Sequence, residues 1–352
     1  MPNHSVARLN DTGSHNGADR GTITTSAKRT YLNNSLPARV GDTYICPKHG
    51  VNAIRTGSLK VWVESRRLAR VGSKTWCGAT IDSGAHNVTD GSAETDPFAD
   101  PAAASGGFDV SCVPEIMFRE EWPIAAKFLV KWITARANPD LDKGATDTTS
   151  VTLEWLESFP RAKAVLEEIS DPLVWFNEAA QRQLCEEIAD QGAFRNSRST
   201  FGDDLKGPIQ ELDRFFFQQR DANVGRFNNA SALFDPDHLD AALHAFSFRA
   251  VASGFTEPHP AGHGVVIEKV AVYARDQFEF GDEQDLGWWD CENKKYPVPP
   301  IPGFHAALSN RDFREYRSRT GQGGDFLIFS NMRLLELDRN YSFVCPTPFG
   351  PA

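Results

Sequence analysis

Four residues near the start of the chain have side chains that bind zinc readily. They are two histidines and two cysteines: His15, Cys46, His49 and Cys77. His15, Cys46 and Cys77 follow one another at intervals of 31 residues, and His49 stands three residues after Cys46. Two thiolates and two imidazoles make the closed tetrahedral set that structural zinc prefers. The spacing predicts a structural Zn2+ site here, and the alternative is two buried free cysteines with two surface histidines.

The interval of 31 residues belongs to a repeat in the first 91 residues. Residues 38–41 read Ala-Arg-Val-Gly, and the same four residues return at 69–72. A third, partial copy follows at 81–84, where Ile-Asp-Ser-Gly echoes Ile-Arg-Thr-Gly at 54–57. Units of about 30 residues cannot each bury a core, so we expect the copies to pack around a common axis. With so little apolar content, that axis needs a staple such as the predicted metal.

Several motifs in these repeats are specific. Leu-Pro-Ala-Arg-Val-Gly-Asp stands at 36–42, Cys-Pro-Lys-His-Gly at 46–50, Leu-Ala-Arg-Val-Gly at 68–72 and Cys-Gly-Ala-Thr-Ile at 77–81. With these motifs, residues 5–91 resemble the PAAR-repeat proteins, which cap the trimeric VgrG spike of the bacterial type VI secretion system. The resemblance implies an all-β cone of short hairpins with a zinc ion near its apex. It also implies a base that docks on the VgrG spike trimer.

The charges are distributed unevenly along the chain. The net charge is -10, yet residues 1–91 hold 12 Lys and Arg against 6 Asp and Glu, and the remainder holds 25 against 41. The basic side chains of the first part are dispersed and form no stripe, and the second part is acidic. We therefore expect no nucleic acid partner. A membrane is expected only as the target of puncture by the spike.

The cysteine content and the first residues bear on localisation. Six cysteines in 352 residues are too sparse for a disulfide scaffold and predict folding in a reducing cytoplasm, with Cys291 and Cys345 as structural thiols. The opening residues lack the apolar stretch of a Sec signal peptide. No apolar run is long enough to span a bilayer. Together with the PAAR resemblance, this predicts synthesis in the producer cytoplasm and export through the type VI system into a target cell.

The sequence predicts two domains and a linker. Residues 1–91 form the PAAR-repeat domain, residues 92–111 are rich in Pro, Ala, Gly and Asp and read as a linker, and residues 112–352 form an α+β extension. Helical periodicity dominates residues 112–220, including one helix that begins at Asp171 and reaches Asp190. Strands are expected at 245–252, 264–273, 326–329 and 341–345. The extension thus has a helical first half and a β-rich second half.

The residues of the extension best suited to catalysis follow its strongest strand. Asp276 and Glu279 could form a general acid/base pair or bind a hard divalent cation, with Asp282 or Asp285 completing the ligand shell. Such groups are commonly placed in the loop after a strand. The alternative is a solvated acidic loop whose tryptophans, Trp288 and Trp289, lie in the core.

The extension also resembles an uncharacterised family that is often fused to PAAR modules. The resemblance runs from about Cys112 to Cys345, is clearest over residues 270–289, 310–313 and 323–330, and brings no known reaction. Two functions are therefore open. The extension is either a toxin effector, which would need a cognate immunity protein, or a non-catalytic adaptor that loads cargo or contacts a chaperone.

Overall fold

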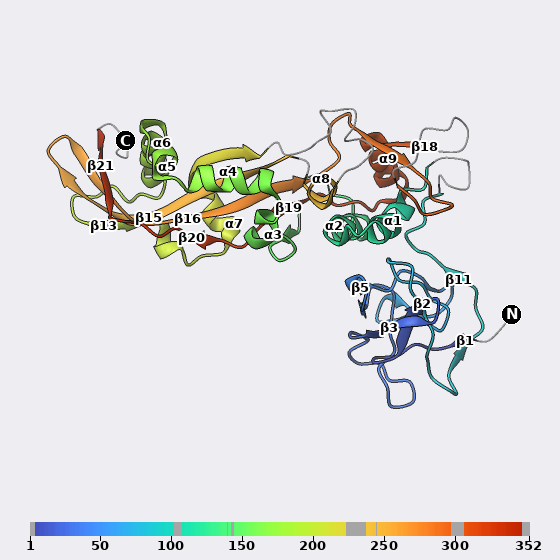
Figure 1. Ribbon diagram of the computed structural model, residues 1–352. Coiled ribbons are helices and arrows are strands. Elements are labelled where there is room, and N and C mark those ends of the chain that lie inside the picture. The colour runs from blue at the N-terminus through green and yellow to red at the C-terminus, as the bar shows by residue number, and fades with distance from the viewer. Residues whose placement is uncertain are drawn as a thin grey trace. The chain divides into compact units, whose positions relative to one another are not determined.

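Figure 1 shows the computed structural model of the chain as a ribbon. The structure describes residues 4–101, 108–138, 140–141, 144–222, 237–243, 245–296 and 306–346. The chain separates into two compact units. The first comprises Met1–Pro139, Asn229–Ala242 and Glu279–Asp325, and the second comprises Asp140–Asn228, Leu243–Phe278 and Phe326–Ala352. Each unit is therefore assembled from three separate stretches of the chain.

The N-terminal region of the first unit is built from short strands and tight turns. Its largest sheet has the order β5-β4-β3-β2-β9. The members are β2 Thr12–His15, β3 Ala18–Ile23, β4 Thr43–Cys46, β5 Gly50–Ala53 and β9 Thr80–Ile81. Three antiparallel pairs accompany it: β1 His4–Ser5 with β10 Thr89–Asp90, β6 Gly57–Ser58 with β11 Glu94–Thr95, and β7 Trp62–Val63 with β8 Arg66–Arg67. The predicted all-β fold of short hairpins is confirmed.

The sequence repeat appears as a closed ring of backbone hydrogen bonds. The N–H of Ala7 donates to Ala69 O, that of Ala38 to Ala7 O, and that of Ala69 to Ala38 O, at 2.9–3.0 Å. All three alanines are fully buried. Three copies of the repeat therefore meet at a common axis, and alanine recurs there because a larger side chain would have no room.

An arginine follows each of these alanines and fixes the next turn. The arginine N–H donates to a side chain three residues later, in the pairs Arg8–Asp11, Arg39–Asp42 and Arg70–Ser73. In the first two copies the guanidinium also bonds the same aspartate. Serine replaces aspartate in the third copy, and there Arg70 pairs with Asp90 at 3.2 Å and Glu94 at 2.7 Å. The departure from the repeat at Ser73 is thus compensated by carboxylates from outside it.

The remainder of the first unit is helical around an aromatic core. It contains α1 Val113–Arg119, α2 Pro123–Thr134, α8 His238–Ala242 and α9 Asn310–Thr320, with the pair β17 Asp285–Trp289 and β18 Ala306–Ser309. Trp132 of α2 is fully buried against Phe280 and Phe313. Its indole N–H donates to Asp325 at 2.8 Å. This bond satisfies the one polar atom that the ring brings into the core.

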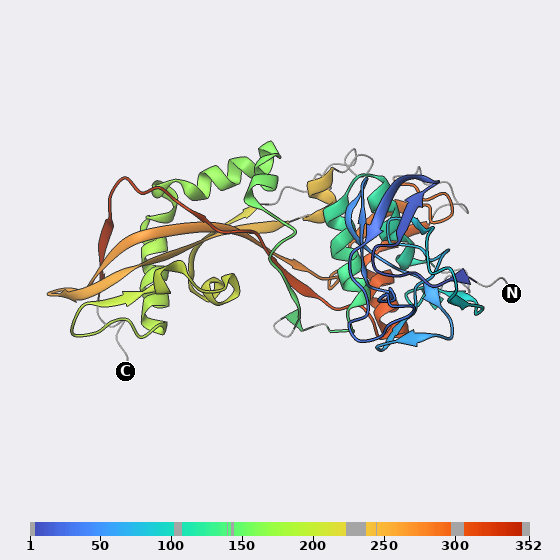
Figure 2. The ribbon, with the colours of Figure 1, turned by 90° about the horizontal axis from the view of Figure 1, so that it is seen from below.

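The second unit is an eight-stranded sheet with helices packed on it. Its backbone is the hairpin of β15 Phe246–His259 and β16 Gly262–Phe278, whose two strands run side by side along the unit in Figure 2. The order β12-β19-β16-β15-β13 is extended by β14 on β15 and by β20 and β21 on β16. The other strands are β12 Thr146–Asp147, β13 Ser199–Phe201, β14 Phe216–Ala222, β19 Phe326–Phe329, β20 Arg333–Leu334 and β21 Tyr341–Pro346. The helices are α3 Leu153–Glu157, α4 Pro160–Ser170, α5 Pro172–Trp175, α6 Glu178–Asp190 and α7 Ile209–Leu212.

The predicted α+β character of the extension is confirmed, and two details differ. Asp171 caps a helix as expected, but the chain breaks after α5 and Asn177 caps α6 separately. The single helix expected over 171–190 is therefore two. The stretch 112–220 also contains β13 and most of β14, which its helical periodicity did not reveal. Both pair with β15 in the sheet, so long-range pairing decided their conformation.

The prediction of a chain without disulfides is wrong. Cys112 is bonded to Cys291 and Cys185 to Cys345, whereas Cys46 and Cys77 are free and buried. Cysteine density misled the sequence argument because the bonded partners lie 179 and 160 residues apart. Cys291 and Cys345 are structural, but as half-cystines.

The residues predicted as a linker are partly described. Glu94–Thr95 form β11 against β6, and the side chain of Asp100 pairs with Arg319 at 2.9 Å. Residues 102–107, like His244 and His305, lie outside the described residues. In the part of the chain that the structure describes, no helix is both long and apolar enough to cross a membrane.

Candidate metal centre

The four residues predicted as zinc ligands lie together in the N-terminal region. One ligand atom from each of His15, Cys46, His49 and Cys77 falls within 4.8 Å of all the others. Cys46 Sγ is 3.5 Å from both His15 Nε2 and His49 Nδ1, and Cys77 Sγ is 3.6 Å from His15 Nε2. Sequence spacing alone brought together residues from four different turns, so the set could bind a metal.

Short hairpins deliver each ligand to this set. His15 ends β2, and Cys46 ends β4 and pairs with Gly50, so that the turn between them also places His49. Cys77 lies in the turn before β9, the strand that pairs with β2. Gly50 and Gly78 adopt φ of +67° and +83° in these turns, a region that residues with a Cβ rarely enter. The ligands are therefore held by hairpin ends whose geometry the glycines allow.

Burial sets the protonation of the metal-free set. It lowers the pKa of His49 to about 4 and also lowers the pKa of His15, while it raises the pKa of the Cys77 thiol to about 12. Both histidines are therefore held as neutral imidazoles, which is the form that binds a metal. A cation in the set would reverse the pressure on the thiols and stabilise thiolates.

The surroundings of the set suit a structural ion. His49 Nε2 is buried and has no hydrogen-bond partner among the described residues, so the ring's polar contact is with the other ligands through Nδ1. The Cys77 N–H donates to Asn52 at 3.3 Å, and Thr75 Oγ1 lies 3.3 Å from Cys77 Sγ. Such outer contacts orient ligands and support thiolate charge. Two sulfurs and two nitrogens complete a tetrahedron, leaving no position for a reacting water.

Comparison with known proteins divides the chain at the same place. A model of the PAAR motif matches residues 7–83. A family of unknown function, DUF6402, matches residues 108–295 and 302–345, which is well over half of the chain. The chain belongs to the DUF6402 family. It is also a PAAR-repeat protein, and no curated protein matches it.

The PAAR motif connects the first part of this DUF6402 protein to secretion. PAAR proteins are secreted by the type VI system, and the motif supports a spike-tip role and implies association with VgrG. The candidate metal set lies inside the matched residues. The DUF6402 match covers the helices and strands that follow, and it brings no activity with it.

The residues predicted to be catalytic lie in the DUF6402 part and belong to different compact units. Asp276 is a half-buried residue of β16, opposite Ile328, in the second unit. Glu279 is an exposed residue of the first unit, where burial of its carboxyl group and the nearby charges of Asp325 and Asp282 raise its pKa. Their pairing stays a prediction.

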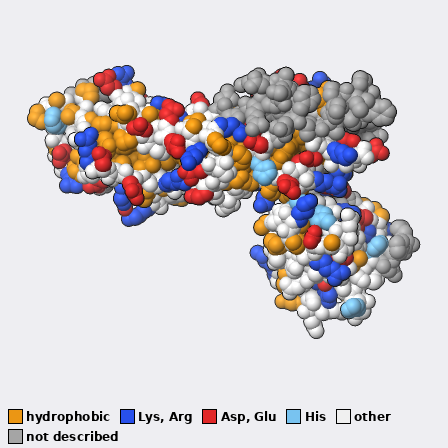
Figure 3. Space-filling model, in the orientation of Figure 1, with side chains coloured by type: hydrophobic (Ala, Val, Ile, Leu, Met, Phe, Trp, Pro, Cys, Tyr) orange, Lys and Arg blue, Asp and Glu red, His pale blue; other side chains and the backbone are white. Residues whose placement is uncertain are grey.

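The carboxylates expected to complete that site have other partners. Asp282 Oδ1 accepts from Asn310, and Asp285 pairs with Ser309 in the β17–β18 ladder. In the described residues, the only group of three or more His, Cys, Asp or Glu side chains close enough to hold a metal is the PAAR set. On the face of the DUF6402 protein seen in Figure 3, acidic and basic side chains are interspersed.

The tryptophans of the same loop have different environments. Trp289 is buried, and its indole N–H donates to Leu286 O at 2.8 Å, whereas Trp288 is half-buried. Sequence reasoning missed the two disulfides of the DUF6402 part entirely. No spacing rule could have paired cysteines that separate strands and helices bring together only in the finished fold.

Proposed function

We propose that this chain is a metal-stapled tip of the type VI spike, which carries its DUF6402 region into a target cell as a toxin effector. The observation that carries the first half is the convergence of His15, Cys46, His49 and Cys77 within a PAAR motif. The ion would be a structural zinc, which supplies cross-linking of the hairpin ends and no reaction. The domain boundaries proposed are 1–91 for the tip, 92–111 for the linker and 112–352 for the extension.

The role of the tip is mechanical. A small β fold with a ring of backbone hydrogen bonds at its axis resists distortion, and a metal that joins four turns stiffens it further. Its partner is the VgrG spike trimer, to which the tip transfers the load of sheath contraction. The target membrane is met only as a barrier to be punctured.

The effector role of the extension rests on its size and its independent fold. The DUF6402 match covers about two thirds of the chain, far more than a tip requires. Asp276 and Glu279 are the proposed catalytic residues, and a cognate immunity protein is the proposed partner in the producer. An adjacent open reading frame for such a protein would favour this role.

One observation favours an adaptor as the second candidate. Leu173 of α5 is 84% exposed and Leu334 of β20 is 56% exposed, so two large apolar side chains of the second unit face solvent. Exposed apolar side chains suit the binding of cargo or a chaperone. An adaptor would need no catalytic carboxylates and no immunity protein.

Growth of cells that express residues 112–352, with and without a Sec signal, separates the two candidates. An effector stops growth in one compartment, and Asp276→Ala/Glu279→Ala restores it. The matched control is Glu257→Ala/Glu268→Ala, which removes two exposed carboxylates from the β15–β16 hairpin. A folded fragment that is harmless in both compartments would contradict the effector role and favour the adaptor.

A further inference from the structure

The six cysteines are divided between two chemical states according to their place in the fold. Cys46 and Cys77 belong to the metal set of the PAAR motif. The other four form two disulfides, and each compact unit contains one of them: Cys112–Cys291 in the first and Cys185–Cys345 in the second. No cysteine of the DUF6402 region is left as a thiol. This division needs an environment that oxidises four cysteines and spares two.

Each disulfide joins an early helix to a late segment of the same unit. Cys112 precedes α1 and is bonded to Cys291, just after β17. Cys185 lies in α6 and is bonded to Cys345 in β21. Because the partners are 179 and 160 residues apart, each bond closes a very long loop. Closing a long loop restricts the unfolded chain strongly, so each bond locks one unit.

The second unit has enough apolar contacts to fold before its disulfide forms. Tyr341 of β21 packs against Trp175 and Phe176 with ring centroids 4.8 and 4.9 Å apart, and Phe343 packs against Phe176 at 6.0 Å. β21 is also hydrogen-bonded to β16 from Gly262 to Ile267. These contacts hold β21 in place without the Cys185–Cys345 bond. The reduced unit is therefore expected to be folded but not covalently locked.

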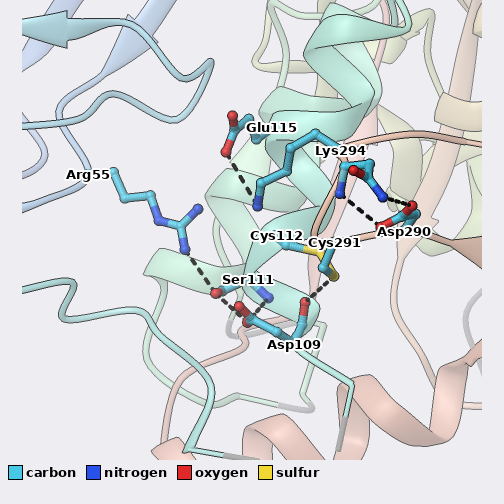
Figure 4. Close-up of a disulfide and its surroundings, with 9 residues drawn as sticks. Arg55, Asp109, Ser111, Cys112, Glu115, Asp290, Cys291 and Lys294 are labelled. Carbon is cyan, nitrogen blue, oxygen red and sulfur yellow. Dashed lines mark hydrogen bonds and ion pairs between the residues drawn. A yellow bond between two sulfur atoms is a disulfide. The ribbon is translucent and has the colours of Figure 1, made fainter. Parts of the chain in front are cut away.

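The two disulfides differ in access to solvent. Cys185 is 2% exposed and Cys345 is fully buried, so that neither sulfur is open to an attacking thiolate. Cys291 is partly exposed, although its partner Cys112 is buried. Figure 4 shows this bond beside the Lys294–Glu115 ion pair and beside Ser111, which accepts a hydrogen bond from Arg55 at 2.9 Å. Thiol–disulfide exchange requires access, so Cys112–Cys291 is the exchangeable bond of the two.

We infer that the DUF6402 region acts in an oxidising compartment outside the cytoplasm and is locked there by its two disulfides. In the producer cytoplasm the four thiols stay reduced, because reducing systems keep cytoplasmic cysteines in that state. After delivery, a disulfide-carrying thiol oxidoreductase accepts two electrons and two protons from each cysteine pair and becomes a dithiol. The metal keeps Cys46 and Cys77 out of this exchange. The inference rests on the proposed delivery role for its biological meaning.

Counting thiols in the full chain tests this inference. The chain is produced once in the cytoplasm and once behind a Sec signal, then denatured with a chelator and labelled with a maleimide mass tag. We expect six tags per chain from the cytoplasm and two after export. Equal numbers from the two compartments would overturn compartment control. No tags after export would overturn the protection of Cys46 and Cys77.

Two paired variants test the difference in access. The exported native protein is exposed to glutathione and tagged without denaturant. Cys185→Ser/Cys345→Ser, which keeps the accessible bond, should gain two tags, and Cys112→Ser/Cys291→Ser should gain none until denaturant is added. Equal reduction of the two variants would overturn the assignment. If either variant fails to fold, differential alkylation of the wild-type chain followed by peptide mapping gives the same order.

The Sec route does not use the spike, so the thiol count holds or fails independently of the proposed function. A separate secretion assay through the type VI system tests delivery. Failure of that assay with six and two tags in the two compartments would overturn the spike role alone. Successful secretion of a chain that keeps six thiols in the recipient would overturn the redox inference alone.

Discussion

The PAAR and DUF6402 regions of this chain are held together by different means. In the PAAR region, charged side chains are buried: Arg39, Asp42, Arg70 and Asp90 are all less than 8% exposed. In the DUF6402 region, large aromatic side chains such as Trp132, Trp175 and Phe248 are fully buried instead. One region closes around ion pairs and a candidate metal set, and the other around an apolar core with disulfides.

This contrast follows from the size of the repeating element. Units of about 30 residues built from two- to six-residue strands bury little apolar surface, so polar networks and a metal must supply the remaining stability. The DUF6402 region has strands of up to 17 residues and helices of up to 13, which can bury whole aromatic rings. A chemical treatment that removes one kind of stabilisation should therefore spare the other region.

Loss of a metal ligand should have the largest effect. Cys46→Ser or Cys77→Ser opens the predicted zinc set, and structural zinc contributes roughly 10–16 kcal/mol of apparent binding energy at neutral pH. We expect the PAAR region to unfold locally and secretion to stop, while the DUF6402 region stays folded. Thermal unfolding and a secretion assay measure the two effects.

The matched control for the ligand variants is His86→Gln. His86 is an exposed histidine outside the metal set. Unchanged export of the cysteine variants would contradict the stapling role of the metal, as would equal damage from the control.

Reduction of the disulfides is expected to act on the other region. Each bond closes a loop of at least 160 residues, which in the chain-entropy account contributes about 5 kcal/mol. Reduction should lower the free energy of unfolding of the DUF6402 region and leave the metal-loaded PAAR region unchanged. Hydrogen exchange resolved by region, with and without a reductant, reports both. Equal loss of protection in the two regions would break the comparison.

Arg70→Ala should cost less than either treatment and should act on the PAAR region. Arg70 is 2% exposed, and its removal leaves the carboxylates of Asp90 and Glu94 without their cation. Breaking a buried pair in this way costs about 3–5 kcal/mol. Arg20→Ala is the control, because Arg20 is largely exposed in its pair with Asp82 and should cost under about 1 kcal/mol. Denaturant unfolding that ranks the two variants equally would argue against the buried network.

The smallest effect is a dependence of PAAR stability on acid. Backbone N–H groups of Lys28 and Arg29 donate to Glu64 and lower its pKa from 4.5 to about 2. Because the folded pKa is depressed, the contribution of Glu64 is present above pH 4.5 and is lost as the pH falls toward 2. Glu64→Gln should flatten that part of the stability profile. Urea midpoints measured from pH 6 to 2 check this, and identical slopes for both proteins would contradict it.

How much of the molecule the sequence predicts depends on the distance between interacting residues. The metal set was predictable because a repeat of 31 residues places His15, Cys46 and Cys77 at equivalent positions. The strands of the β15–β16 hairpin and β19 were predictable because their apolar runs are continuous. Local patterns were sufficient in both cases.

The rest could not be predicted because it depends on contacts between distant segments. Six cysteines allow 15 complete pairings, and the sequence holds no signal that selects Cys112 with Cys291. β13 and β14 lie in a stretch with helical periodicity and become strands by pairing with β15. The placement of Asp276 and Glu279 in separate units likewise follows from the three-part assembly of each unit.

The intact mass of the full chain, exported behind a Sec signal, tests the central claim most directly. The account predicts a native mass with one zinc ion bound. After denaturation it predicts a mass four hydrogens below that of the reduced chain, since two disulfides have formed and the PAAR cysteines have not. A folded chain without metal, or a denatured mass lower by six hydrogens, would contradict the division of the molecule into a metal-closed tip and a disulfide-closed extension.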